Sequence, residues 1–191
     1  FLKQVPSDVL VVLDEAYFEY VNAPEFKDTL HYVKEYPNVI IMRTFSKAYG
    51  LASFRVGYAY AQEEVIAKLD PVRGPFNNTV LSQKIAIVAL EDQQFIQDCR
   101  TKNENAKKQF VEFCHKHGLN YYPSQTNFIL FEVKADSDVV FQEMMKRGFI
   151  IRSGNALGTP GYIRVTFGTE EQNSKFLTLL EEVLTEQGVF A

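Results

Sequence analysis

The chain has 191 residues and is 46% hydrophobic, which is enough to bury a core in one large domain or two small ones. Its 24 acidic and 20 basic residues give a net charge of −4 without a basic run, so nothing in the charge supports binding to nucleic acid or to an anionic membrane. No apolar stretch approaches the roughly 20 residues of a membrane span, and no signal-peptide pattern opens the chain. The composition favours a protein that acts on small molecules.

The two cysteines, Cys99 and Cys114, do not form a redox or metal-binding motif. We interpret both as reduced structural residues of a cytoplasmic protein, and we expect no metal. The sequence begins with Phe1 rather than methionine, a few residues before a predicted strand. We therefore expect it to be a segment of a longer polypeptide.

The first predicted strand is the apolar run over residues 9–13. Apolar runs without alternation are typical of strands covered on both faces, as in a parallel sheet flanked by helices. Because open α/β sheets bind ligands at the carboxyl ends of their strands, Asp14 and Tyr17 are predicted to lie at a site.

The second predicted strand, over residues 39–42, leads into a loop that carries Lys47. A lysine amine can form a Schiff base with a carbonyl, and beside other cations in a partly desolvated site it is neutral often enough to attack. Thr44 and Ser46 provide hydroxyls beside it, and Ser46 and Arg55 can together hold a phosphate. Taken alone, the same residues also fit an ordinary solvated loop.

The remaining elements indicate two parts. We predict a strand over 56–61 and helices over 29–35, 63–69, 79–90 and 93–117; then strands over 121–123, 127–133, 148–152 and 161–167, with helices over 137–147 and from Thr169 to Gln187. The middle of the long helix is polar, as in a helix that bridges domains. We therefore assign residues 1–105 to part of a large α/β domain and 106–191 to a small α+β domain.

An acid, a phenol, a lysine and, on either side of that lysine, a serine and an arginine are what pyridoxal phosphate requires. A carboxylate keeps its ring nitrogen protonated, a phenol tunes the Schiff base, and serine with arginine holds the phosphate. Each signal is weak alone, but their order and spacing together are fairly specific.

At these residues the chain resembles the fold-type-I pyridoxal-phosphate aminotransferases, and most of all their histidinol-phosphate branch. The segments that carry the resemblance span nearly the whole chain: VVLDEAYFEY (11–20), RTFSKAYGLASFRVGY (43–58), RGPFNN (73–78), TNFIL (126–130), IIRSGNALG (150–158) and YIRVTFGTEEQN (162–173). One departure is Ser53-Phe54 before Arg55, where relatives often carry glycine; we expect it to be tolerated, with an effect on local packing.

The resemblance implies roles for individual residues. Lys47 would be the Schiff-base lysine and the acid/base, Asp14 the partner of the pyridine nitrogen, and Tyr17 a hydrogen-bond donor to the ring hydroxyl. Ser46 and Arg55 would hold the cofactor phosphate. In the same family the upstream half of the chain supplies a further phosphate contact, a stacking aromatic ring and an asparagine, and a tyrosine comes from a partner subunit. This chain would then hold about half of an active site in a homodimer.

Three residues of the tail are implied to bind substrate. Arg164 matches the arginine that binds the α-carboxylate, Arg152 matches the one that meets the substrate phosphate in histidinol-phosphate enzymes, and Asn127 would line the same cleft. A planar guanidinium pairs two oxygens at once, which suits both anions. The alternative for each arginine is a surface salt bridge.

The expected reaction is transamination between glutamate and imidazole-acetol phosphate, giving histidinol phosphate in histidine biosynthesis. Two arginines suit a pocket that must accept a carboxylate from one substrate and a phosphate from the other. The alternatives are an aromatic amino-acid aminotransferase, a phosphothreonine-type decarboxylase on the same scaffold, and a non-catalytic fragment or dimerisation piece. The segment alone is expected to be inactive.

Overall fold

The computed structural model describes residues 1–190, which form two compact units. The first unit is Phe1–Cys99, and the second runs from Arg100 to the end of the described residues. The division falls within helix α4 (Gln93–His117). Within residues 1–190, each helix is either too short or too polar to cross a membrane.

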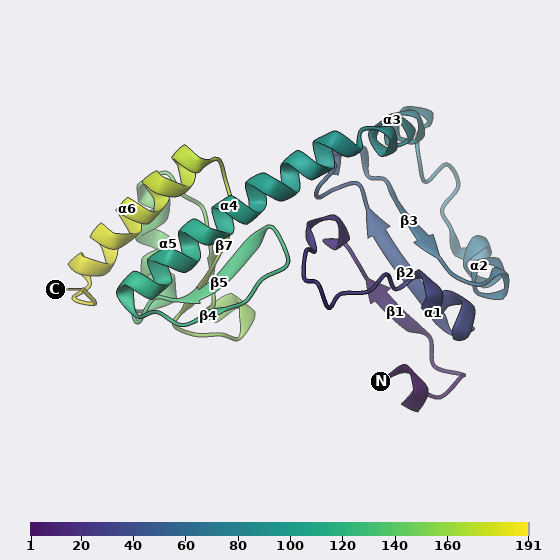
Figure 1. Ribbon diagram of the computed structural model, residues 1–191, viewed down its shortest axis with the longest axis horizontal. Coiled ribbons are helices and arrows are strands. Elements are labelled where there is room, and N and C mark those ends of the chain that lie inside the picture. The colour runs from purple at the N-terminus through teal and green to yellow at the C-terminus, as the bar shows by residue number, and fades with distance from the viewer. Residues whose placement is uncertain (191) are drawn as a thin grey trace. The chain divides into compact units, whose positions relative to one another are not determined.

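The first unit contains a three-stranded sheet in the order β1-β2-β3, with helices beside it (Figure 1). Its regular elements are β1 (Val11–Asp14), β2 (Val39–Thr44), β3 (Gly57–Tyr60), α1 (Leu30–Glu35), α2 (Glu63–Leu69) and α3 (Val80–Glu91), with short 3₁₀ helices at Leu2–Gln4, Phe18–Tyr20, Ala52–Phe54 and Asp70–Val72. Strands β1 and β2 are parallel, and β3 is antiparallel to β2. The parallel pair therefore brings two carboxyl ends side by side.

The core of the first unit forms around the segment between β2 and β3. Phe45, Ala48, Tyr49 and Val56 are buried there, together with residues of α3 and of the start of α4. Apolar side chains thus anchor this connection on both sides of its exposed positions.

The second unit is an antiparallel sheet in the order β4-β5-β7-β6, covered on one face by helices (Figure 1). Its elements are β4 (Tyr121–Tyr122), β5 (Phe128–Glu132), β6 (Arg152–Ser153), β7 (Tyr162–Thr166), α5 (Ser137–Lys146), α6 (Glu170–Glu186) and a 3₁₀ helix at Asn155–Leu157. Every second residue of β5 and β7 is buried against α4, α5 and α6. The alternate residues form the opposite face of the sheet.

The α/β unit followed by an α+β unit confirms the predicted fold class. Helix α2 has the predicted bounds, and Thr169 with Gln172 forms the expected capping box at the start of α6. One predicted strand was wrong in extent: residues 148–152 were expected to be extended, but only Arg152–Ser153 pair. Gly148 has a φ of 88°, and Phe149 N donates to Met144 O, so this segment caps α5 instead.

Candidate active site

Asp14 and Lys47 follow neighbouring parallel strands of the first unit. Asp14 ends β1 and pairs in register with Met42 of β2, and Lys47 lies three residues beyond the end of β2. Asp14 and Lys47 are both exposed, so a ligand can reach them. The two groups thus lie at the carboxyl end of the sheet, where open α/β sheets bind ligands.

The loop that carries Lys47 is held in one shape by its neighbours. Phe45 and Ala48 are buried on either side of it. Leu51 N donates to Phe45 O (2.9 Å), and Gly50 makes the turn with a φ of 70° that few other residues adopt. Because the flanks are fixed, the amine extends from a defined backbone position.

Tyr17 lies beside this amine. The Nζ atom of Lys47 is 5.1 Å from the centre of the Tyr17 ring, which is within the range of a cation–π contact. Tyr17 directly precedes the 3₁₀ helix Phe18–Tyr20, three residues after Asp14. The structure therefore brings the predicted phenol and amine together, and the predicted carboxylate lies at the end of the adjacent strand β1.

The predicted phosphate-binding residues, Thr44, Ser46 and Arg55, lie where the loop between β2 and β3 begins and ends. Thr44 pairs with Gly57, and Phe45 N donates to Val56 O (3.2 Å), so the next residues in this register are Ser46 and Arg55. Ser46 N donates to Thr44 Oγ1 (3.0 Å).

Arg55 has an unusual backbone. Its φ is 52°, the left-handed region that a non-glycine residue rarely adopts, and it caps the 3₁₀ helix Ala52–Phe54. Its Nη1 donates to Ala52 O (2.8 Å). Residues in such conformations are often found at ligand-binding sites, and the role of Arg55 in binding a phosphate stays a prediction.

A buried ion pair behind these strand ends escaped the sequence analysis. Nε of Arg43 donates to Glu15 Oε2 (2.9 Å), and Nη2 lies 2.9 Å from the same oxygen. Burial alone would lower the pKa of Arg43, but the hydrogen bond and charge of Glu15 outweigh it, so the pKa lies above its usual value. The available signal was an acid and an arginine at corresponding ends of adjacent strands.

In the second unit, Arg152 and Arg164 are register partners on β6 and β7. Both side chains therefore leave the same face of the sheet, opposite the helices. The guanidinium carbon of Arg164 is 4.9 Å from the centre of the Phe128 ring. Among the residues described, neither arginine makes an ion pair. Asn127 directly precedes β5, and its carbonyl accepts from Phe167 N (2.9 Å).

The strand that carries Arg152 is fixed by a polar cluster. Ser153 Oγ and Asn155 Nδ2 both donate to the carboxylate of Asp138 in the first turn of α5. These two bonds, that of Asn155 above all, lower the pKa of Asp138. Because the carboxylate stays ionised, β6 remains tied to α5 at neutral pH.

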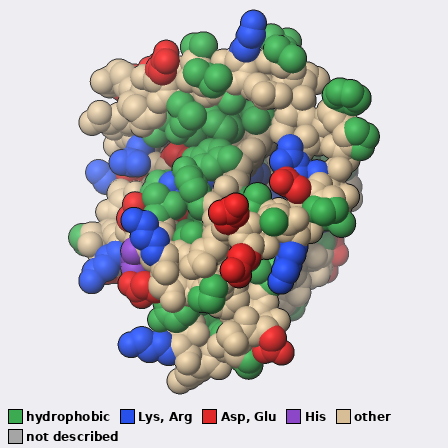
Figure 2. Space-filling model, turned by 90° about the vertical axis from the view of Figure 1, so that its right-hand side faces the viewer, with side chains coloured by type: hydrophobic (Ala, Val, Ile, Leu, Met, Phe, Trp, Pro, Cys, Tyr) green, Lys and Arg blue, Asp and Glu red, His purple; other side chains and the backbone are tan. Residues whose placement is uncertain are grey.

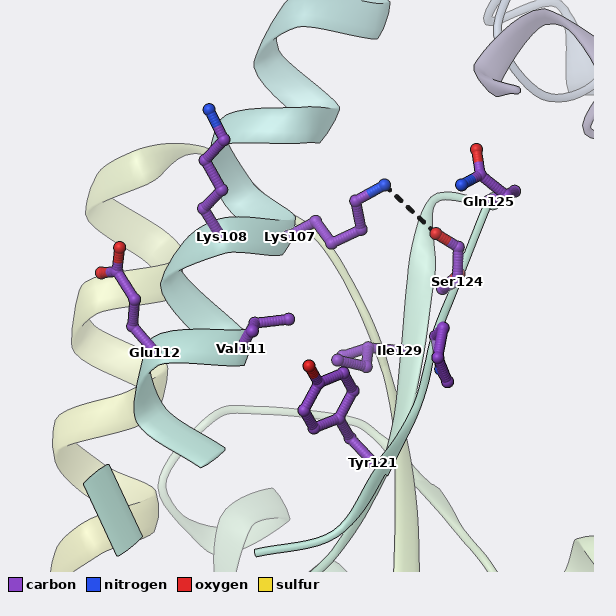
Figure 3. Close-up of a pocket in the computed structure, with 9 residues that line it drawn as sticks. Lys107, Lys108, Val111, Glu112, Tyr121, Ser124, Gln125 and Ile129 are labelled. Atoms are coloured by element: carbon purple, nitrogen blue, oxygen red, sulfur yellow. Dashed lines mark hydrogen bonds between the residues drawn. The ribbon is translucent and has the colours of Figure 1, made fainter. Parts of the chain in front are cut away.

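A separate hollow in the second unit contains none of the predicted site residues. It has a volume of about 330 Å³ and is lined from α4 and from the segment around β4 and β5 (Figure 3). Of the two lysines that line it, Lys107 already contacts Glu104 (2.6 Å) and the carbonyl of Ser124 (3.2 Å). We therefore do not assign this hollow to the candidate active site.

The family model and the similar proteins all indicate the same family. The family model "Aminotransferase class I and II" matches residues 2–180. The chain is 69% identical over its full length to a histidinol-phosphate aminotransferase of Lysinibacillus sphaericus, covering 52% of that protein. It is 55% identical over 97% of its length to one of Brevibacillus brevis, covering 51% of it.

A solved structure shows the same architecture. The crystal structure of histidinol-phosphate aminotransferase from Sinorhizobium meliloti in complex with pyridoxal-5'-phosphate has a TM-score of 0.86 and 29% identity, over 97% of this chain and 51% of that one. This likeness confirms the predicted fold type. The chain spans about half the length of the relatives it matches.

Proposed function

The chain belongs to the class I and II aminotransferases, and we propose that it is part of a histidinol-phosphate aminotransferase of histidine biosynthesis. The full-length enzyme would transfer an amino group between glutamate and imidazole-acetol phosphate. The observation that supports the proposal is the contact of Lys47 with Tyr17 beyond the end of β2, next to the strand that ends in Asp14. The identity of 69% to a protein of that name supports the choice of substrate.

The residues at this strand end fit pyridoxal phosphate by their chemistry. Lys47 would hold it through Nζ, Asp14 would pair with the ring nitrogen, and Tyr17 would donate to the ring oxygen. The hydroxyls of Thr44 and Ser46 and the guanidinium of Arg55 would bind the phosphate. When bound, the cofactor withdraws electrons from the α-carbon of an amino acid, which makes its proton easier to remove.

Lys47 is the residue that we propose to move this proton. Its amine would take the proton from the substrate α-carbon and return a proton to a carbon of the cofactor. The defined loop around it limits the positions of Nζ, and a fixed distance to the reacting carbon is a large part of such catalysis. Tyr17, beside the amine, restricts it further.

Arg152 and Arg164 would bind the anionic ends of the two substrates. We propose that Arg164 holds the α-carboxylate of glutamate, and that Arg152 holds the phosphate of the imidazole substrate. Asn127 would contribute to the same pocket. Two guanidinium groups from register partners repel each other unless an anion lies between them, so this pair favours anionic ligands.

We propose further that the enzyme is a cytoplasmic homodimer. Its two cysteines are free, which suits a reducing compartment. Figure 2 shows hydrophobic side chains gathered on one face of the molecule, and the exposed hydrophobic residues include Val80, Leu81, Ile87 and Val88 of α3. Such apolar surface is typical of protein interfaces. The mass of the full-length protein in solution tests this assignment.

Steady-state kinetics of the full-length polypeptide test the reaction. We expect a higher kcat/KM with imidazole-acetol phosphate than with aromatic keto acids, with glutamate as the amino donor. A preference for aromatic keto acids would assign the chain to the aromatic branch instead. Release of carbon dioxide from a phosphorylated amino acid would assign it to the decarboxylases.

A further inference from the structure

We propose that Arg43 is a positioning residue of the cofactor site, which holds the strand ends of Asp14 and Lys47 and the segment of Tyr17 in register through its contacts with Glu15 and Phe18. This inference rests on the proposed function, since it assumes that these strand ends bind pyridoxal phosphate. Arg43 itself is not proposed to touch the cofactor or the substrate.

The ion pair of Arg43 and Glu15 connects the ends of β1 and β2 on one face of the sheet. Glu15 directly follows Asp14, and Arg43 directly precedes Thr44. Because successive residues of a strand point to opposite faces, Arg43 and Glu15 lie on the face opposite to Asp14 and Thr44. Glu15 N also donates to Met42 O (2.9 Å), which continues the ladder past the end of β1. The two ligand-bearing ends are thus connected by backbone and by charge.

The carboxylate of Glu15 is satisfied on both oxygens. Oε2 accepts from Nε of Arg43 and faces Nη2, and Oε1 accepts from the hydroxyl of Thr29, next to α1. The side chains of Arg43 and Glu15 are only 8% and 10% exposed. The carboxylate of Asp28 lies further away, 3.7 Å from Nη2, and is 61% exposed. Glu15 is therefore the main partner of the guanidinium.

The other side of the guanidinium contacts the Tyr17 segment. Its central carbon is 3.4 Å from the centre of the Phe18 ring. Phe18 directly follows Tyr17, whose ring lies 5.1 Å from Nζ of Lys47. One guanidinium thus touches the segments that carry the acid, the phenol and the lysine.

A buried ion pair at this place needs a reason other than stability. Apolar replacements of such pairs are often neutral or stabilising, because the cost of desolvating two charges offsets their attraction. A planar guanidinium fixed by one carboxylate and one ring gives instead a defined geometry, which an apolar contact does not impose. Catalytic arrangements require that kind of definition.

The test measures binding of pyridoxal phosphate to the full-length polypeptide by absorbance titration, together with the melting temperature of the cofactor-free protein. We expect Arg43→Met and Arg43→Lys each to raise the Kd for pyridoxal phosphate at least tenfold. Lysine keeps the charge but cannot stack on Phe18 and contact Glu15 through two nitrogens. We therefore expect the melting temperature of Arg43→Lys to lie closer to that of the unaltered protein than the melting temperature of Arg43→Met does. The Kd of Arg43→Lys should stay raised.

A double-mutant cycle tests whether the pair acts as one unit. We expect Glu15→Gln to raise the Kd, and the double variant with Arg43→Met to raise it no more than the larger single effect. Arg147→Met is the matched control, because Arg147 also pairs with two carboxylates, those of Glu143 (2.9 Å) and Glu186 (2.7 Å). It should leave the Kd unchanged.

The outcomes separate this inference from the proposed function. If the unaltered full-length protein does not bind pyridoxal phosphate, the proposed function is wrong. If it binds, and both Arg43 variants bind equally well, the positioning role is wrong even where the melting temperature falls. Should Arg43→Met not fold, Thr29→Val removes only the hydroxyl bond to Glu15. We expect it to raise the Kd several-fold, and an unchanged Kd would overturn the inference.

Discussion

Arg152 and Arg164 lie directly opposite each other on the antiparallel strands β6 and β7. Their side chains share the face of the sheet that the helices of the second unit do not cover. Like charges in such a position destabilise a sheet unless a counterion separates them. The pair is therefore a candidate anion site, as our proposal for the two substrates requires.

Replacing Arg152 should distinguish the two anions. In the full-length enzyme we expect Arg152→Ala to raise the KM for the phosphorylated substrate at least tenfold, because a charge-assisted hydrogen bond is worth about 1.5–3 kcal/mol. The KM for glutamate should change less, whereas Arg164→Ala should raise the KM for glutamate more than the KM for the phosphorylated substrate. Steady-state kinetics with each substrate varied in turn measure the difference. An equal effect of Arg152→Ala on both would show that Arg152 is not the phosphate site.

Gly57 offers a test of the packing behind the candidate site. A Cβ atom at this position would lie 2.8 Å from the carbonyl oxygen of Arg43, on the neighbouring strand. We expect Gly57→Ala to destabilise the protein by about 1–3 kcal/mol, as overpacking usually does. Gly74→Ala is the matched control, because an added Cβ there has no neighbour within 4 Å. Thermal unfolding measures both, and equal melting temperatures would contradict the β2–β3 contact.

Stability should fall in alkaline solution. Burial raises the pKa of Cys114 from 9.0 to about 12, and burial is also the main cause that raises the pKa of Tyr58 from 10.0 to about 12. The folded state thus holds these protons where the unfolded chain has lost them. The contribution of these groups to the free energy of unfolding is therefore fully present below pH 9. It declines toward pH 12, by at most about 1.4 kcal/mol per pH unit for each group.

The melting temperature of the full-length protein between pH 7 and pH 11 measures this decline. Cys114→Ala lowers stability at every pH by removing buried volume, but it should flatten the alkaline slope. An unchanged slope in this variant would show that the Cys114 thiol does not contribute to it.

Much of this arrangement could be predicted because its signals are local. The apolar runs before Asp14 and before Lys47 both specify strands, and parallel pairing of consecutive strands brings their carboxyl ends together. Burial was predicted correctly for β2 but not for β1, whose residues alternate between half-buried and exposed. The capping residues of α6 are likewise set by neighbours in sequence, Thr169 and Gln172.

Of the two features that escaped prediction, the first depends on a contact between distant residues and the second on a local helix cap. The Arg43–Glu15 pair joins positions 28 residues apart, and no periodicity encodes such a partner. Residues 148–151 contain good strand formers, yet the hydrogen bond from Phe149 N to Met144 O takes them into the end of α5. A local cap, with Gly148 in the left-handed conformation, overrides β-propensity there.

The central claim is that Lys47 holds pyridoxal phosphate beside Asp14. The direct measurement is to incubate the full-length polypeptide with pyridoxal phosphate, reduce it with borohydride, and locate the modified lysine by peptide mass spectrometry. We predict a single modified peptide carrying the label on Lys47, and no label at that position or elsewhere in Lys47→Ala. Stable binding of the cofactor with the label on another lysine, or with none, would contradict the claim.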